Sequence, residues 1–142
     1  MMSQVFVSGH KSPDTDSIAA ALSYSYLKRR LGMDAVAVRA GEINKESRFA
    51  LDYFDLEEPI LVTSVARKNP EDEKQKVILV DHNESKQTID GMDDAEVLEI
   101  IDHHRFGDFE SENPIFILVR PVGCVNTVIY GLYLSLIHIS EP

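Results

Sequence analysis

The sequence of 142 residues has a single cysteine and no long apolar run. One cysteine, Cys124, excludes an intramolecular disulfide and is typical of a reducing compartment, so we expect a cytoplasmic protein. No segment reaches the roughly 18 consecutive apolar residues of a membrane-spanning helix, and the N-terminal stretch MMSQVFVSGH lacks the charged start of a signal peptide. We therefore expect no membrane partner.

Positive charge is also scarce. Lys and Arg together number 14 against 24 Asp and Glu, which gives a net charge of −10, and the basic side chains form no stripe along the chain. We therefore expect no nucleic-acid partner. An acidic protein that acts on an anionic substrate needs metal ions or a second, basic surface, and carboxylates and imidazoles are suitable metal ligands.

Short apolar strands alternate with helical segments along the chain, in which apolar residues make up 44%. Runs rich in Val, Ile and Leu predict strands within 4–8, 34–41, 59–63, 76–84, 96–104 and 114–123. Apolar residues at helical spacing predict helices that begin after Ser12 or Asp14, at Asn44 and at Cys124 and end before Gly32, near Phe54 and near Leu134. This alternation predicts an α/β fold with a mostly parallel sheet and helices on both faces.

Three of the predicted strands end in potential metal ligands. These are His10, Asp14 and Asp16 after the first strand, Asp81 and His82 after the fourth, and Asp102, His103 and His104 after the fifth. Because ligands gather beyond the carboxyl ends of parallel strands, we expect these side chains to converge at one edge of the sheet. Oxygen and imidazole ligands without thiolate suit Mn, Mg, Co, Fe or Zn.

The number of these ligands exceeds the need of one ion, so we expect a two-metal site. Two ions about 3.5–4 Å apart can hold a phosphoryl group and acidify a water molecule. Asp14 and Asp16 lie two residues apart in an irregular turn, so they can point at two different ions.

Four motifs, GHKSPDTDS, LVDHNE, IIDHHRFGDF and RPVGC, occur in this order between Val5 and about Tyr130. They resemble those of family II, manganese-dependent inorganic pyrophosphatases in the DHH phosphoesterase superfamily. The resemblance implies the N-terminal metal-binding domain of an enzyme that hydrolyses diphosphate to two phosphates with two Mn²⁺ ions, for which Co²⁺ or Mg²⁺ can substitute. It also implies a smaller C-terminal domain that brings Lys and Arg to the diphosphate, and a homodimer formed through an edge of the sheet.

The resemblance assigns roles to individual residues. It implies that His10, Asp14 and Asp81 bind one ion, that Asp16, Asp81 and His103 bind the other, and that Asp81 bridges them. His104 would lie beside the substrate and the leaving phosphate, so His104 and Asp81 are the candidate catalytic residues. Behind the ligands, Asp102 would orient a histidine, and His82 and Asn83 would support the site.

The chain departs from the family pattern towards its end. We expect residues 1–130 to be an incomplete DHH metal-binding domain and residues 131–142 to be an atypical tail that is not native. The family's later Asp ligand and its basic C-terminal domain are missing from the sequence, so we expect this chain alone to hydrolyse diphosphate poorly or not at all.

Two alternatives stay open. A related DHH phosphoesterase would act on polyphosphate or an oligonucleotide, but no basic or aromatic channel for a nucleic-acid strand is apparent in the sequence. The second alternative is a metal-binding fragment without catalytic activity.

Overall fold

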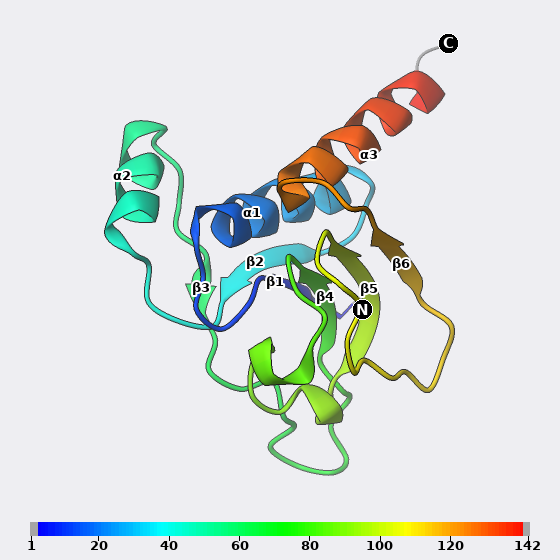
Figure 1. Ribbon diagram of the computed structural model, residues 1–142. Helices are drawn as coiled ribbons and strands as arrows, with labels where there is room; N and C mark the ends of the chain where they lie inside the picture. Colours follow the sequence, from blue (N-terminus) through cyan, green and yellow to red (C-terminus); the bar gives the residue numbers. More distant parts are fainter. Residues whose placement is uncertain (1–2, 141–142) are drawn as a thin grey trace.

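The computed structural model describes residues 3–140, with the side chains of 3–136, and within them six strands form one parallel sheet (Figure 1). The strand order is β3-β2-β1-β4-β5-β6. The strands are β1 (Val5–Ser8), β2 (Ala35–Arg39), β3 (Ile60–Leu61), β4 (Lys76–Val80), β5 (Glu96–Asp102) and β6 (Phe116–Val119). All their pairings are parallel, which confirms the predicted α/β class.

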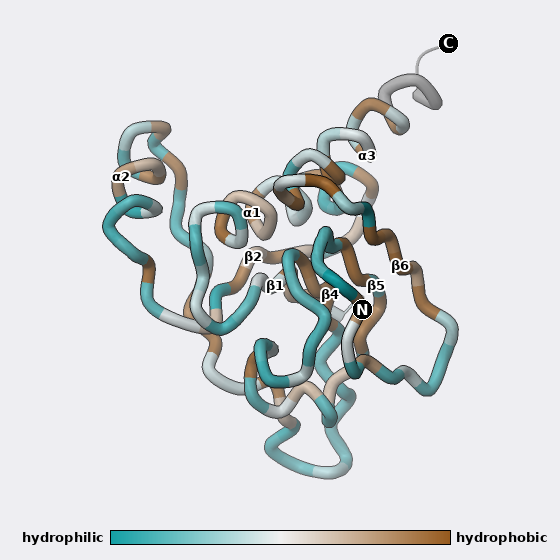
Figure 2. The backbone as a smooth tube through the Cα atoms, viewed as in Figure 1, coloured by the Kyte–Doolittle hydropathy of each residue, from teal (hydrophilic) through white to brown (hydrophobic). Residues whose placement is uncertain are grey.

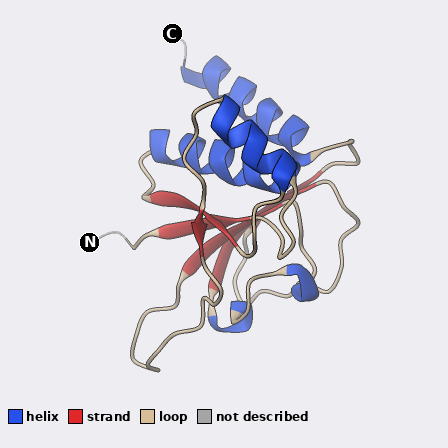
Figure 3. Cartoon of the chain, turned by 90° about the vertical axis from the view of Figure 1, so that its left-hand side faces the viewer, coloured by secondary structure: helices blue, strands red, loops and turns tan. Residues whose placement is uncertain are grey.

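The two faces of the sheet are covered differently. The helices α1 (Thr15–Arg30), α2 (Lys45–Tyr53) and α3 (Val125–Ser140) lie on one side of the sheet, where α1 packs against α3 (Figure 3). Loops and two short 3₁₀ helices, η1 (Ser85–Gln87) and η2 (Met92–Asp94), cover the other side, so the α-helices predicted for both faces lie on one face only. No helix within residues 3–140 is long and apolar enough to cross a membrane.

Strand β4 is buried on both faces and divides the core into two apolar clusters. Because successive side chains of a strand point to opposite faces, Ile78 and Val80 join the cluster under the helices, and Val77 and Leu79 join the cluster under the loops. Apolar residues accordingly concentrate in the strands, and hydrophilic residues dominate the connecting loops (Figure 2). A strand buried on both sides is typical of a parallel sheet.

The chain reverses its direction of travel across the sheet between β3 and β4. Strands β1, β2 and β3 are added towards one edge, and β4, β5 and β6 are added on the other side of β1. The neighbours β1 and β4 therefore flank the switch point, where open α/β sheets bind ligands. The segments that follow β1, β4 and β5 are those that carry the predicted metal ligands.

The predicted helix boundaries are close to those observed. Asp14 caps α1 by accepting a hydrogen bond from the Ser17 backbone N at 2.8 Å, and Asn44 caps α2 in the same way. Gly32 follows α1 with a φ of 97°, a left-handed conformation that favours glycine.

Helix α3 extends beyond its predicted end. It continues through 131–140 without a break, because the sequence there has neither Gly nor Pro after Gly131 to stop it. Leu132, Tyr133 and Leu136 pack against the apolar cluster under the helices, and the Tyr133 hydroxyl donates to the backbone oxygen of Ser23. The last two residues of the predicted tail, 141–142, lie outside the described residues.

Candidate metal centre

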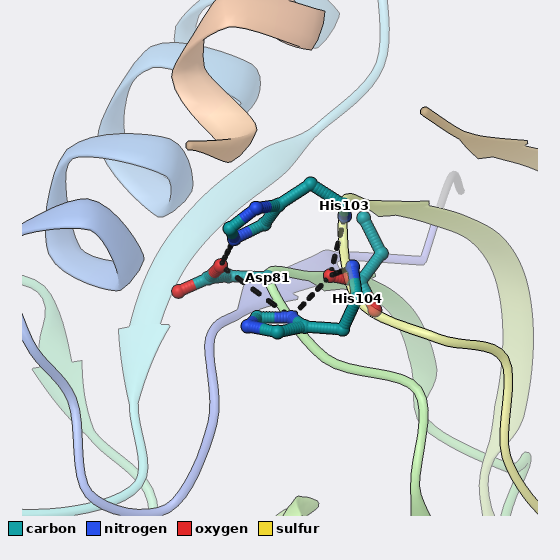
Figure 4. A group of neighbouring side chains, drawn as sticks. Asp81, His103 and His104 are labelled. Carbon is teal, nitrogen blue, oxygen red and sulfur yellow. Dashed lines mark hydrogen bonds and ion pairs between the residues drawn. The ribbon is translucent and has the colours of Figure 1, made fainter. Parts of the chain in front are cut away.

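Asp81 is the central residue of the site. It follows β4 with a φ of 65°, which is uncommon for a residue other than glycine, and its side chain is 2% exposed. Its Oδ2 accepts a hydrogen bond from the Ser17 hydroxyl at 3.0 Å and lies 3.4 Å from Nε2 of His10. Its Oδ1 lies 2.9 Å from Nε2 of His103 (Figure 4). The two oxygens of one buried carboxylate thus face two different histidines.

The loop between β1 and α1 forms the Oδ2 side of Asp81. Nε2 of His10 lies 3.7 Å from Oδ1 of Asp14, and ligand atoms of these two residues and Asp81 all lie within 4.8 Å of one another. Gly9 lets this loop pack on the first turn of α1, since a Cβ at Gly9 would lie only 2.7 Å from the Ser17 Cβ.

The Oδ1 side of Asp81 is formed by segments far apart in the sequence. Nδ1 of His103 donates to the backbone oxygen of Val122 at 2.9 Å, which fixes the ring and turns Nε2 towards Asp81. Oδ2 of Asp16 lies 3.6 Å from the same Nε2. Asp14 and Asp16 therefore lie on opposite sides of Asp81, although only one residue separates them.

Asp102 is completely buried and is saturated with hydrogen-bond donors. It accepts from Nδ1 of His104 at 2.7 Å, from the backbone N atoms of His103 and His104, and from Nδ2 of Asn83 at 2.7 Å. The histidine that it orients is His104, whose half-exposed ring keeps Nε2 for other partners (Figure 4). Nδ1 of His104 is also 3.9 Å from Oδ1 of Asp81.

Asn83 and His82 lie behind these side chains. Asn83 donates to the backbone oxygen of Arg105 and accepts from the backbone N of Gly107, so it ties Asp102 to the loop after His104. His82 is buried, and its Nδ1 donates to the backbone oxygen of Val80. Its Nε2 has no hydrogen-bond partner among the described side chains, and its ring meets that of His10 edge-on at 6.5 Å.

The pKa shifts reflect the negative charge of the site. The hydrogen bond to Asp81 raises the pKa of His10. Burial lowers the pKa of His103, but the hydrogen bond to Val122 and the charge of Asp81 outweigh it, and the pKa is raised overall. Burial opposes ionisation of Asp81, yet hydrogen bonds from His10 and Ser17 lower its pKa. Burial lowers the pKa of His82 to about 4, which keeps that ring neutral.

These observations fit a bound divalent cation. Asp81 is a buried carboxylate whose contacts within the described residues come from histidines and a serine and include no Lys or Arg. A second cluster of ligand atoms within 4.8 Å of one another comprises Asp81, Asp102, His103 and His104. Oxygen and imidazole donors of this kind suit Mn²⁺, Mg²⁺ or Zn²⁺. The structure brings together all nine predicted site residues, and their individual roles stay predictions.

Two polar residues of the site were not singled out from the sequence. Ser17 donates to Asp81, and Asn126 donates through Nδ2 to Oδ1 of Asp16. Ser17 follows Asp16 directly in the first motif, so its place there was a usable signal. The sequence signal for Asn126 was weaker, because it is only a lone amide in the first turn of an apolar helix.

This domain is therefore an α/β domain with a parallel sheet, and the carboxylates and histidines at its switch point could hold a metal ion. The family described as "DHH family, N-terminal domain" matches residues 4–141. The chain therefore belongs to the DHH family.

Its relatives share most of this chain and are longer. A protein of Exiguobacterium sp. and one of Bacillus licheniformis, both named as manganese-dependent inorganic pyrophosphatases, are each 50% identical over 132 residues. That alignment covers 93% of this chain and 41% of each relative, so the chain spans about two fifths of the length of these relatives.

Solved structures agree with this placement. A Methanococcus jannaschii protein named as a family II inorganic pyrophosphatase superimposes with a TM-score of 0.80 at 38% identity, over 92% of this chain and 39% of that one. An exopolyphosphatase-related protein of Bacteroides fragilis reaches a TM-score of 0.63 at 16% identity over 94% of this chain and 39% of that one, which shows a shared fold.

Proposed function

We propose that residues 1–130 are the metal-binding domain of a manganese-dependent inorganic pyrophosphatase, which hydrolyses diphosphate to two phosphates. The observation that carries this proposal is the arrangement around Asp81, whose two oxygens face His10 and His103. The names of the Exiguobacterium and Bacillus relatives support the choice of diphosphate and of manganese.

The two proposed ion positions use different ligands. His10, Asp14 and Asp81 would hold one Mn²⁺, and Asp16, Asp81 and His103 the other. When bound, the two ions supply positive charge at the phosphoryl oxygens and lower the pKa of a water molecule. The protein's part is orientation: Ser17 fixes the Asp81 carboxylate, and the Val122 carbonyl holds Nδ1 of His103 so that Nε2 is the ligand atom.

His104 is the proposed proton donor to the leaving phosphate. Asp102 holds Nδ1 of His104 through a hydrogen bond of 2.7 Å, so the free Nε2 is the atom that meets the substrate. The His104 side chain is half-exposed and lies next to Asp81. It is therefore beside the proposed ion positions and accessible to an anionic substrate. A hydrogen-bond donor positioned in this way stabilises the charge that develops on the leaving oxygen.

We propose that the chain alone supplies too little positive charge to hold a diphosphate. Its net charge is −10, and we propose that the further length of its relatives includes a domain that supplies Lys and Arg to the substrate. Since charge stabilisation and positioning dominate phosphoryl transfer, we expect the 142-residue chain to turn over diphosphate more slowly than about 1 s⁻¹, the low end of common enzyme rates. The lone cysteine supports our proposal that the protein acts in the cytoplasm.

A chimaera tests the proposed activity. Residues 1–130 of this chain would replace the corresponding part of the Bacillus licheniformis relative, which supplies the remaining length. We expect Mn²⁺-dependent phosphate release from diphosphate, with polyphosphate and oligonucleotides hydrolysed at least about 100-fold more slowly. A chimaera that binds Mn²⁺ and hydrolyses an oligonucleotide faster than diphosphate contradicts the proposal, and the same chimaera with Asp81→Asn is the inactive control.

We also propose a homodimer that forms through the β3 edge of the sheet. Ile60 and Leu61 of β3 are exposed, and β3 has only one neighbouring strand in the described sheet. The chain that leads into β3 exposes further apolar side chains, including Phe49 and Tyr53, whose rings stack at 6.0 Å. Sedimentation should give a dimer that Leu61→Lys dissociates, and a monomeric wild type would refute this proposal.

A further inference from the structure

Asp16 is joined to the first turn of α3, which lies more than a hundred residues further along the chain. The backbone N of Val125, the first residue of α3, donates to Oδ2 of Asp16 at 3.0 Å. Nδ2 of Asn126 donates to Oδ1 of Asp16 and to its backbone oxygen at 3.1 Å. The first N–H groups of a helix have no partner within the helix, so Asp16 serves as the N-terminal cap of α3.

The amide of Asn126 is itself oriented. The Ser23 hydroxyl lies 3.4 Å from Oδ1 of Asn126 and donates to it, which leaves Nδ2 to point at Asp16. Asn126 therefore links two positions of the Asp16–Ser23 stretch to α3. With both carboxylate oxygens of Asp16 held from α3, Oδ2 is kept 3.6 Å from Nε2 of His103. That oxygen still has a second lone pair for an ion after it accepts from Val125.

The same short segment also orients His103. The backbone oxygen of Val122 accepts from Nδ1 of His103 at 2.9 Å, and Val125 and Asn126 follow three and four residues later. The segment 122–126 thus supports both side chains on the Oδ1 side of Asp81. The hydrogen bonds and ion pairs of His10 and Asp14 in the site instead join them to Asp81, to α1 and to each other.

We propose that Asn126 is a positioning residue that fixes Asp16 for one ion, so that the start of α3 controls the ion position at Asp16 and His103 and leaves the one at His10 and Asp14 unaffected. This inference rests on the proposed two-metal site. Asn126 does not touch the ion itself. It acts by preventing the Asp16 carboxylate from turning away from His103, in the way that partners behind metal ligands set metal affinity.

Two substitutions of Asn126 test this role. Asn126→Leu keeps a side chain of similar size without its donor, and Asn126→Ala removes the side chain. Calorimetric titration of the 142-residue chain with Mn²⁺ should show one of its two ions bound about 10- to 100-fold more weakly in both variants, and the other bound as in the wild type. Asp16→Ala should weaken the same ion. Thr127→Ala is the matched control, because Thr127 is exposed on the same helical turn and should leave both affinities unchanged.

A spectroscopic signature separates positioning from a general loss of structure. Two Mn²⁺ ions that share a carboxylate couple magnetically, so at two equivalents the wild type should give the spectrum of a coupled pair and Asn126→Ala that of an isolated ion. Wild-type affinity for both ions in both variants would overturn the inference, as would equal weakening of both ions. A wild type that binds no Mn²⁺ would overturn the metal site itself, together with this inference.

Discussion

The two sides of the Asp81 carboxylate are built in contrasting ways. The Oδ2 side comes from one short loop, which contains both His10 and Asp14 and is closed by the first turn of α1. The Oδ1 side joins Asp16 to His103 and to the start of α3, three segments that only the folded chain brings together.

Exposure follows the same division. The Asp14 side chain is 59% exposed, and the Asp16 side chain is 20% exposed. The ligands His10 and Asp14 therefore lie together on one short loop, whereas the second ion position depends on the docking of α3. Variants of either side should affect the two ions unequally, and only Asp81 should affect both.

The largest effect is expected for Asp81→Asn. The substitution removes the charge that both sides share and replaces one ligand oxygen by an amide that repels cations, so we expect the loss of both Mn²⁺ ions. Equilibrium dialysis with Mn²⁺ measures the number bound. Asp93→Asn, an exposed carboxylate outside the site, is the control for a simple change in net charge. Retention of one tightly bound ion by Asp81→Asn would contradict a shared ligand.

Substitution of either histidine should remove one ion. His103→Ala deletes the ligand of the Oδ1 side and His10→Ala that of the Oδ2 side, so each should weaken a different ion by more than about 100-fold. Calorimetric titration of both variants and of the double variant distinguishes the two ions. If both single variants lower the affinity for the same ion, the division of the site into two sides is wrong.

Lower pH should weaken the binding of both ions, because the ions compete with protons for the same imidazoles. The hydrogen bond to Asp81 raises the pKa of His10, and that of His103 is also raised overall. Below these raised values each histidine is protonated before an ion binds, so the dissociation constant should increase by about tenfold per pH unit for each proton displaced. Mn²⁺ titrations at pH 8, 7 and 6 test this, and equal affinities at all three would exclude histidine ligands.

The smallest effect is expected for Ser17→Ala. The substitution removes one hydrogen bond to Oδ2 of Asp81, but the contact between Asp81 and His10 remains. The affinity for the Oδ2-side ion should therefore fall by about tenfold or less. Ser25→Ala is a matched control, since Ser25 is buried on the same helix and donates to the backbone oxygen of Leu22. A larger effect on the Oδ1-side ion than on the Oδ2-side ion would contradict the assignment of Ser17 to the Oδ2 side.

The sequence was informative where local patterns decide structure. Apolar runs identified the strands, and the capping residues Asp14 and Asn44 marked the starts of two helices. Because all strands are parallel, the Asp and His residues at their carboxyl ends necessarily meet at one edge, and the grouping around Asp81 followed from that. The resemblance to DHH enzymes added roles that neither spacing nor composition could assign.

Contacts between distant segments were not predictable from these patterns. Nothing in the sequence near Asp16 indicates that Asn126 will bond to it, because that contact depends on how α3 docks on α1. Likewise, His82 and His103 each neighbour another candidate ligand in an Asp-His motif, yet β4 turns His82 into the core and β5 presents His103 to Asp81. Strand register and backbone conformation make that difference.

The central claim is that Asp81 joins two ion positions, and electron paramagnetic resonance of the chain titrated with Mn²⁺ tests it most directly. We expect two ions per chain, with the spectrum of a magnetically coupled pair at two equivalents and no coupled pair in Asp81→Asn. A single ion per chain, or two ions without magnetic coupling in the wild type, would contradict the account.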